Sequence, residues 1–152
     1  MVHRVLSMAE ACAQGTKLWC SAAAVMAATG GRRGRRAAGA GVAAMALAQL
    51  VGNGVAKRVV DRPRPPKEWI PHDKVEERPA SPSFPSGHTA AATAFCCAVL
   101  PAWPAAALVC TVPAVLVAVE RVHSGAHYPS DVTAGALIGL AGARLVRHAA
   151  RT

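Results

Sequence analysis

Long apolar runs without charge alternate with short charged segments along this chain. Residues 37–56 contain no charged side chain, and a helix of that length can cross a hydrocarbon layer of about 30 Å. Residues 89–119 are also uncharged but too long for one crossing, and the Pro-Ala-Trp-Pro sequence at residues 101–104 divides them into two helices. Residues 131–146 predict a further helix, with Arg144 near enough to its end to reach the headgroups.

A shorter apolar segment covers residues 18–29. It becomes a full span only if its helix begins earlier and keeps Lys17 at the interface. No strand-like alternation and no internal repeat is visible. The pattern predicts an all-α integral-membrane bundle of about five transmembrane helices. It forms one domain over residues 1–152, in which residues 1–16 are an N-terminal segment and residues 57–86 a long polar loop.

Composition separates this class from a small soluble helical bundle, whose buried helices also contain apolar runs. Hydrophobic residues make up 53% of the chain and charged residues 16%, with a mean hydropathy of +0.28. The apolar runs lack the polar face of a surface helix, and their many Gly and Ala residues suit close packing in a membrane. The membrane class is therefore favoured.

Neither the N-terminal apolar stretch nor the cysteines indicate a cleaved signal peptide or a metal site. Residues 5–13 loosely resemble a signal peptide, but Glu10 interrupts the short apolar stretch, so cleavage is not expected. The five cysteines are expected to be small hydrophobic residues, because none is spaced as a metal-ligand pair.

The net charge of +9 is compatible with nucleic acid, an anionic membrane surface or an anionic substrate. The placement of the charges distinguishes these three partners, because the charges lie in blocks between apolar runs. The block Arg32, Arg33, Arg35 and Arg36 predicts a cytoplasmic juxtamembrane loop rather than a nucleic-acid contact. With that loop inside, the next span carries Lys57 to the extracytoplasmic face. No nucleic-acid partner is expected.

Three motifs surround the polar loop. The first runs from Lys57 to Pro65 and contains Arg64, so two cations flank the end of a span. The second is Pro85-Ser86-Gly87-His88-Thr89, in which Ser86 is a good N-cap and the free N–H groups of the new helix attract an anion. The third contains Arg121, His127, Pro129 and Asp131; Pro129 suits a first helical turn, so that Asp131 can become a hydrogen-bond partner of His127.

The order and spacing of these motifs resemble the three-part signature of the type-2 phosphatidic acid phosphatases, which is shared with vanadium haloperoxidases and glucose-6-phosphatase. Lysine, six residues and Arg-Pro are followed by Pro-Ser-Gly-His, and then by arginine, five residues, histidine, three residues and aspartate. The resemblance extends over residues 57–131. It implies a single membrane domain of this family, without the extra first helix of larger members.

The resemblance implies a role for each motif residue. Lys57, Arg64 and Arg121 would bind the substrate phosphate, together with Ser86 and the Gly87 backbone. His127 would attack phosphorus, His88 would protonate the leaving oxygen and Asp131 would orient His127. No metal and no cofactor is expected. Taken singly, Lys57 and Arg121 would be interpreted as headgroup anchors, and the triple motif reverses that preference. His88 and Asp131, taken singly, could equally be plain helix-start residues.

One position departs from the family pattern. Glu120 stands immediately before Arg121, where the family usually has serine. Its carboxylate would either pair with Arg121 or a neighbouring base, or weaken phosphate binding. Asn53, between two glycines near a span end, is expected either to reach the site or to serve helix packing.

The resemblance implies hydrolysis of a lipid phosphate or diphosphate through a phosphohistidine intermediate, because a site at the ends of membrane helices meets a headgroup readily. Short bacterial members of the family act on polyprenyl carriers, such as undecaprenyl diphosphate and decaprenylphosphoryl phosphoribose, or on phosphatidylglycerophosphate, and the sequence does not choose among them. A bacterial plasma-membrane location is expected, with the site on the extracytoplasmic face that the arginine block predicts. Two alternatives are a phosphate-binding membrane protein made inert by Glu120 and a vanadate-dependent haloperoxidase, although haloperoxidases are large and soluble.

Overall fold

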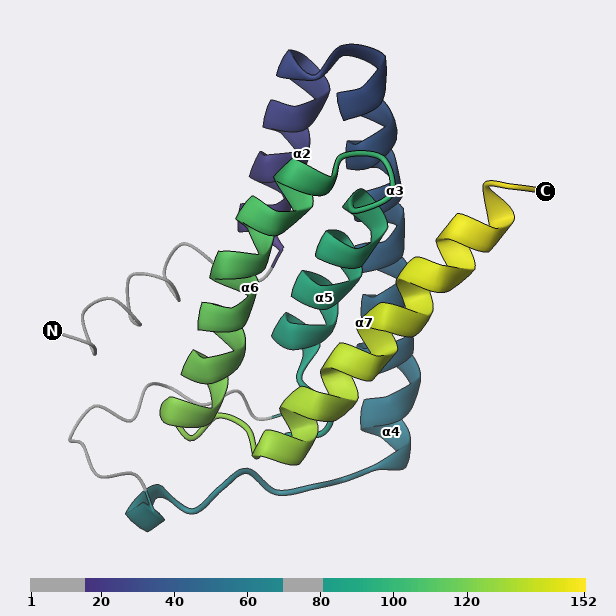
Figure 1. The fold of residues 1–152 in the computed structure, drawn as a ribbon. Coiled ribbons are helices and arrows are strands. Elements are labelled where there is room, and N and C mark those ends of the chain that lie inside the picture. Colours follow the sequence, from purple (N-terminus) through teal and green to yellow (C-terminus); the bar gives the residue numbers. More distant parts are fainter. Residues whose placement is uncertain (1–15, 70–80) are drawn as a thin grey trace, which may run out of the picture.

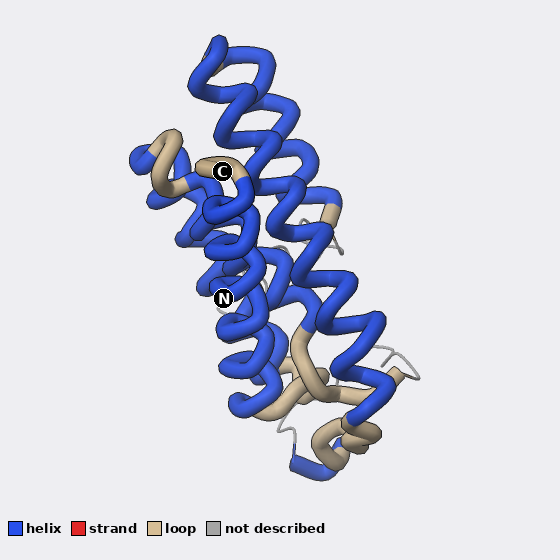
Figure 2. Tube along the Cα trace, turned by 90° about the vertical axis from the view of Figure 1, so that its right-hand side faces the viewer, coloured by secondary structure: helices blue, strands red, loops and turns tan. Residues whose placement is uncertain are grey.

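The computed structural model describes residues 16–69 and 81–152, and these residues form an elongated bundle of helices (Figure 1). A π-helical segment, η1 (Leu50–Ala56), joins α3 to α4 without a break, and a short 3-10 turn, η2, covers Lys67–Trp69. Within the described residues there is no strand (Figure 2). The helices are α2 (Lys17–Thr29), α3 (Gly31–Gln49), α4 (Lys57–Val59), α5 (Gly87–Val99), α6 (Pro104–His123) and α7 (Pro129–Ala149).

The helix boundaries follow the local signals in the sequence. The Pro-Ala-Trp-Pro break separates α5 from α6, as predicted, and Pro104 occupies the first turn of α6. Ser86 is the N-cap of α5, and its side-chain oxygen accepts from the Thr89 N–H. Pro129 begins α7 and Asp131 lies in its first turn, so these three predictions are confirmed.

The start of α3 differs from the prediction. The block of arginines at residues 32–36 is not a loop, because α3 begins at Gly31 and includes all four. Arginine is a good helix former, and the chain turns at Gly30 and Gly31, the latter with a φ of 55°. Arg33 lies in the first turn of α3, and its Nε donates to the Ala102 carbonyl oxygen at 2.7 Å.

Helix α5 forms the centre of the bundle and packs against α3, α6 and α7. Most of its residues are buried, and its Phe95 ring lies 5.5 Å from the ring of Trp19 on α2. Elsewhere the core consists of small side chains, such as Ala44 on α3, Ala94 on α5 and Ala143 on α7. Small residues allow the helix backbones to approach closely where no hydrophobic effect drives them together.

The closest helix contact, between α5 and α7, depends on two glycines of α7. A Cβ atom at Gly135 would lie 2.4 Å from the Ser86 carbonyl oxygen, and one at Gly139 would lie 2.5 Å from that of Ala90. Glycine at both positions lets α7 lie directly on the backbone of α5. This contact joins the beginning of α5 to the beginning of α7, where the second and third motifs lie.

Large apolar side chains point outward from the bundle. Leu108 and Val109 on α6 and Leu137 and Leu145 on α7 are each more than half exposed. Gly31–Val59 and Pro104–His123 are each long and apolar enough to cross a membrane. Small residues inside and large apolar residues outside are the arrangement that a lipid environment favours. The all-α membrane bundle predicted from the sequence is confirmed. Any extension of α2 toward residue 1, and the signal-like segment, lie outside the described residues.

Candidate active site

Three segments of the chain meet at one end of the bundle, where α4, the start of α5 and the α6–α7 turn lie together (Figure 1). They enclose a polar cavity of about 170 Å³. All three motifs contribute to its wall, although residues 57 and 127 are far apart in the sequence. The lining residues are Gln49, Asn53, Lys57, Arg64, Ser81, Gly87, His88, Arg121 and His127.

Three cationic side chains line this cavity. The π-helical segment brings Lys57 to it at the end of the α3–α4 span. Arg64 is held by two carbonyl oxygens, that of Ala126 at 2.7 Å from Nη1 and that of Ser81 at 3.3 Å from Nε. Arg121 lies in the last turn of α6 and is buried. Three cations around a small cavity make a site for an anion with several oxygens, such as phosphate.

His127 is placed by the turn between α6 and α7. Gly125 has a φ of 64°, a conformation that glycine adopts without strain, and the His127 N–H then donates to the Arg121 carbonyl at 2.9 Å. The His127 side chain is buried, and its Nδ1 lies 2.6 Å from the Ser83 carbonyl oxygen. A carbonyl can only accept, so Nδ1 carries the hydrogen. A neutral ring therefore keeps its lone pair on Nε2.

The surroundings of His127 favour that neutral ring. Its pKa is lowered to about 4, mainly by burial and to a smaller extent by the nearby charge of Arg64. The hydrogen bond to Ser83 and the charge of Asp131 act in the opposite direction but do not outweigh burial. At neutral pH, His127 is an uncharged base with Nε2 as its available nitrogen.

The second histidine lies across the cavity at the start of α5. Gly87 and His88 are the first two residues of that helix and both line the cavity. A Cβ at Gly87 would come within 3.3 Å of the Asn53 and Gln49 side-chain oxygens, so glycine keeps this wall open. The free N–H groups of the first turn add to the positive potential of the cavity.

Ser86 and Asp131 are fully buried and lie behind the cavity rather than in its lining. The Ser86 hydroxyl is 3.0 Å from the Thr89 hydroxyl. The backbone N–H of Ser86 donates to the Asp131 carbonyl oxygen at 3.0 Å. Among the predicted site residues, these two are positioned to hold α5 and α7 together. Their predicted roles, a phosphate contact for Ser86 and orientation of His127 for Asp131, remain predictions.

Asp131 has partners other than the expected one. Its Oδ2 accepts from the Tyr128 N–H at 2.9 Å and lies 3.8 Å from His127 Nδ1, which is beyond hydrogen-bond distance. Its Oδ1 accepts from Arg62 at 2.9 Å. Arg62 also donates to Ser130 and lies 4.0 Å from the centre of the Tyr128 ring. The expected hydrogen bond between His127 and Asp131 is thus replaced by one to Ser83.

The departure at Glu120 has a structural consequence. Glu120 is buried, and its Oε2 accepts from the Nε of Arg121 at 2.5 Å. The pair lies in the last turn of α6, and Arg121 reaches the cavity while Glu120 is not among its lining residues. Glu120 therefore contacts the inner edge of the guanidinium group. Of the two readings of this residue, the geometry supports a direct pairing with Arg121.

Sequence reasoning missed several residues at the site. Asn53 reaches the cavity and donates to Gln49 at 2.7 Å, so one of its two expected roles is supported. Gln49, Ser81, Ser83 and Arg62 were not identified. Ser83 acts through its backbone, which carries no residue-specific signal, whereas Arg62 could have been noticed as an additional cation two residues before Arg64.

Comparison with known proteins gives the following matches. The family model described as PAP2 superfamily matches residues 38–152, which include all three motifs. The crystal structure of a transmembrane PAP2-type phosphatidylglycerolphosphate phosphatase from Bacillus subtilis superposes with a TM-score of 0.72 at 21% identity. The alignment covers 97% of this chain and 76% of that one. A search of curated proteins found no significant match.

Proposed function

The chain belongs to the PAP2 superfamily, and on that basis we propose that it hydrolyses a lipid phosphate or diphosphate through a phosphohistidine intermediate, without a metal. The observation that carries the proposal is the composition of the cavity wall. Two histidines, one with an available Nε2, face a cavity that three cations also line. A phosphoryl group needs this combination of a nucleophile, a proton donor and fixed positive charge.

The first half of the reaction transfers the phosphoryl group to His127. Nε2 forms a bond to phosphorus while the bond from phosphorus to the lipid oxygen breaks. Lys57, Arg64 and Arg121 stabilise the negative charge on the non-bridging oxygens. His88 donates a proton to the leaving oxygen, so that the lipid departs as a neutral alcohol or as a shorter phosphate.

The second half regenerates the enzyme. A water molecule gives its proton to His88, which is now a base, and its oxygen attacks phosphorus. The bond from phosphorus to Nε2 breaks, inorganic phosphate is released and His127 returns to its neutral form. The hydrogen bond from Nδ1 to the Ser83 carbonyl supports both steps, because it stabilises the positive charge that the ring develops while bonded to phosphorus.

A metal-free mechanism is supported by the side chains that are present. Within residues 16–69 and 81–152, no three His, Cys, Asp or Glu side chains are grouped so that they could hold a metal ion. The cavity wall contains cations instead, and these would repel a divalent metal. Fixed cations can supply the charge stabilisation that a metal would otherwise provide.

A lipid substrate is supported by the position of the cavity at the ends of apolar helices. A headgroup at the membrane surface reaches such a cavity while its acyl or prenyl chains stay beside the outward-facing leucines and valines. We further propose an extracytoplasmic site in a bacterial plasma membrane. The arginines of α3 lie at the opposite end of the bundle, which the positive-inside rule assigns to the cytoplasm.

The test is phosphate release by purified protein in detergent with EDTA present. The panel contains phosphatidylglycerophosphate, phosphatidic acid, undecaprenyl diphosphate, decaprenylphosphoryl phosphoribose and a soluble alkyl phosphate. We expect hydrolysis of at least one lipid, inhibition by vanadate and no activity in the His127→Ala variant. Activity that disappears with EDTA and returns with magnesium would contradict the metal-free mechanism. Phosphate binding without turnover of any substrate would favour the inert alternative.

A further inference from the structure

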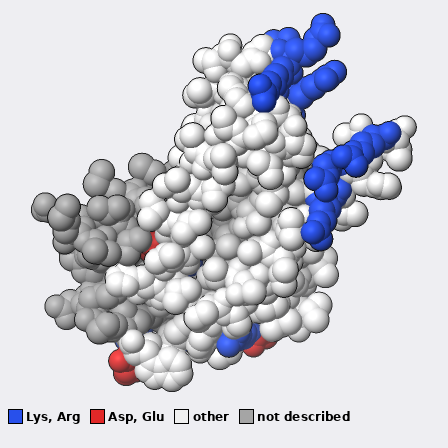
Figure 3. Space-filling model, viewed as in Figure 1, with Lys and Arg blue, Asp and Glu red and all other residues white. Residues whose placement is uncertain are grey.

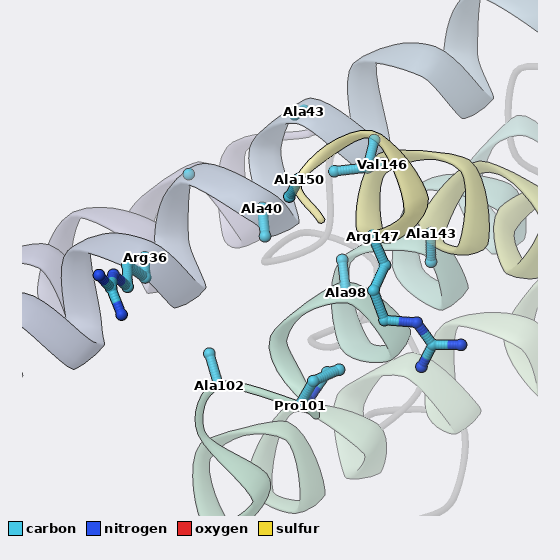
Figure 4. Close-up of a pocket in the computed structure, with 11 residues that line it drawn as sticks. Arg36, Ala40, Ala43, Ala98, Pro101, Ala102, Ala143, Val146, Arg147 and Ala150 are labelled. Atoms are coloured by element: carbon cyan, nitrogen blue, oxygen red, sulfur yellow. The ribbon is translucent and has the colours of Figure 1, made fainter. Parts of the chain in front are cut away.

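A second and larger cavity lies at the opposite end of the bundle, between α3, α5 and α7. Its volume is about 640 Å³, within the range of small-molecule sites. Figure 4 shows its wall, which consists mainly of small apolar side chains such as Ala40, Ala98 and Val146. Among its lining residues, Arg36 from α3 and Arg147 from α7 carry the only charges. The cavity is an apolar groove with two cations at its edge.

This cavity is separate from the candidate active site. Arg36 and Lys57 lie near opposite ends of one continuous helical span, and the 20 residues between them correspond to about 30 Å along a helix. No histidine, serine or acid belongs to the lining of the second cavity. Its chemistry is that of binding and not of phosphoryl transfer.

The charge around this cavity is unbalanced. Figure 3 shows two groups of basic side chains at this end, one over the beginning of α3 and one over the end of α7. No acidic residue occurs between positions 11 and 60, between 78 and 119, or after 131, so the helices that form this cavity bring no carboxylate to it. Arg36 and Arg147 are both exposed. An anion in front of them would lower the electrostatic energy of the pair.

We propose that this cavity binds an anionic phospholipid of the surrounding membrane. Its phosphate is bound at the edge of the cavity, where Arg36 and Arg147 supply the positive charge, and one acyl chain follows the alanine wall between α3, α5 and α7. Guanidinium groups bind phosphate through paired hydrogen bonds, and basic pockets between membrane helices suit anionic headgroups. The apolar wall distinguishes a lipid from a free phosphate, because a soluble anion would leave that surface empty.

The test measures lipid binding by the full chain in detergent micelles, by native mass spectrometry with dioleoylphosphatidylglycerol and dioleoylphosphatidylcholine. The paired variant Arg36→Gln/Arg147→Gln removes both cations. The control Arg32→Gln/Arg151→Gln removes the same charge from two exposed arginines at the same end that do not line the cavity. We expect the dissociation constant for phosphatidylglycerol to rise about tenfold or more in the paired variant, and less than about twofold in the control.

A second variant tests the acyl-chain part without changing charge. Gly39 lines the cavity, and a Cβ there would have no atom within 4 Å, so Gly39→Leu fits the fold and occupies the groove. We expect Gly39→Leu to weaken phosphatidylglycerol binding severalfold and Gly39→Ala to change it little.

Three results would overturn the proposal. Equal losses in the paired variant and its control would mean general surface attraction. Full competition by glycerol 3-phosphate would mean that the phosphate alone is recognised. A lipid-free dimer, lost in Gly39→Leu, would mean that a second copy fills the groove. None of these readouts depends on enzymatic activity, so the result stands apart from that of the proposed function.

Discussion

His127 donates its Nδ1 hydrogen to the backbone carbonyl of Ser83 across 2.6 Å, and this contact joins the α6–α7 turn to the segment before α5. The family resemblance implied Asp131 for this role. A carbonyl cannot take up a proton from the ring, so it fixes the tautomer at every pH at which the ring is neutral. Asp131 is then available to hold Arg62 and the first turn of α7.

The pH dependence of the nucleophile follows from its lowered pKa. A histidine pKa below its ordinary value means that the neutral form persists as pH falls, and here it persists toward about pH 4. We expect the ¹⁵N resonances of His127, assigned by comparison with His127→Ala, to remain those of a neutral Nδ1–H ring at pH 5.5. Titration near pH 6.5 would show that burial does not control this ring. The part of the acid limb of kcat/KM that His127 causes should likewise lie well below pH 6.

Replacing His127 removes the proposed nucleophile. We expect His127→Ala to lose turnover by on the order of 10⁴-fold or more, because His88, the other histidine that lines the cavity, is assigned to proton transfer. With ³²P-labelled substrate and an alkaline quench, the natural protein should retain label on histidine and the variant should not. His148→Ala, at the exposed end of α7, is the matched control. Label in His127→Ala would assign the intermediate to another residue.

His88 should matter most for substrates with poor leaving groups. An alkoxide needs a proton as it departs, whereas p-nitrophenolate leaves readily without one. We therefore expect His88→Ala to reduce kcat for alkyl and lipid phosphates by about 10²-fold to 10⁴-fold and to spare p-nitrophenyl phosphate by comparison. Equal losses for both substrates would argue that His88 serves phosphate binding and not proton transfer.

Arg62 neutralises a carboxylate that is otherwise surrounded by protein. The Asp131 side chain is fully buried, whereas that of Arg62 is 35% exposed. The contribution of this ion pair to stability should therefore lie between that of a buried and that of a surface ion pair. Arg62→Gln should cost on the order of 1 to 3 kcal/mol of stability, seen as a lower Tm in detergent. Arg58→Gln, at an exposed position of the same segment, should leave Tm unchanged. A similar Tm for both variants would mean that Arg62 does not support Asp131.

We expect Glu120, through its ion pair with Arg121, to reduce the positive charge that Arg121 presents to phosphate. Glu120→Gln removes the acid but keeps an oxygen at the position that Arg121 Nε contacts, so we expect KM to fall severalfold while the protein stays folded. Glu120→Ser should shift KM in the same direction but lower Tm, because it removes the carboxylate of a buried ion pair. If both variants lose kcat while folded, Glu120 positions Arg121 and the competition account is wrong.

The sequence by itself determined the helices and the membership of the site. The helices follow from local signals, which act through neighbours within a few residues. These signals are the uncharged runs, the prolines at residues 101 and 104, the N-cap at Ser86 and Pro129 at the start of α7. The motif spacing likewise identified six of the residues that line the active-site cavity, because their residue types remain visible without coordinates: Lys57, Arg64, Gly87, His88, Arg121 and His127.

Only the tertiary structure decided which groups hold the reactive residues. Ser83 and His127 are 44 positions apart, and Arg62 and Asp131 are 69 apart, so neither contact follows from any local pattern. His127 Nδ1 lies 2.6 Å from the Ser83 carbonyl oxygen and 3.8 Å from Asp131 Oδ2, and this difference depends on how the α6–α7 turn packs against the segment before α5. The second cavity arises in the same way, because Arg36 and Arg147 become neighbours of one groove only when α3 and α7 pack beside α5.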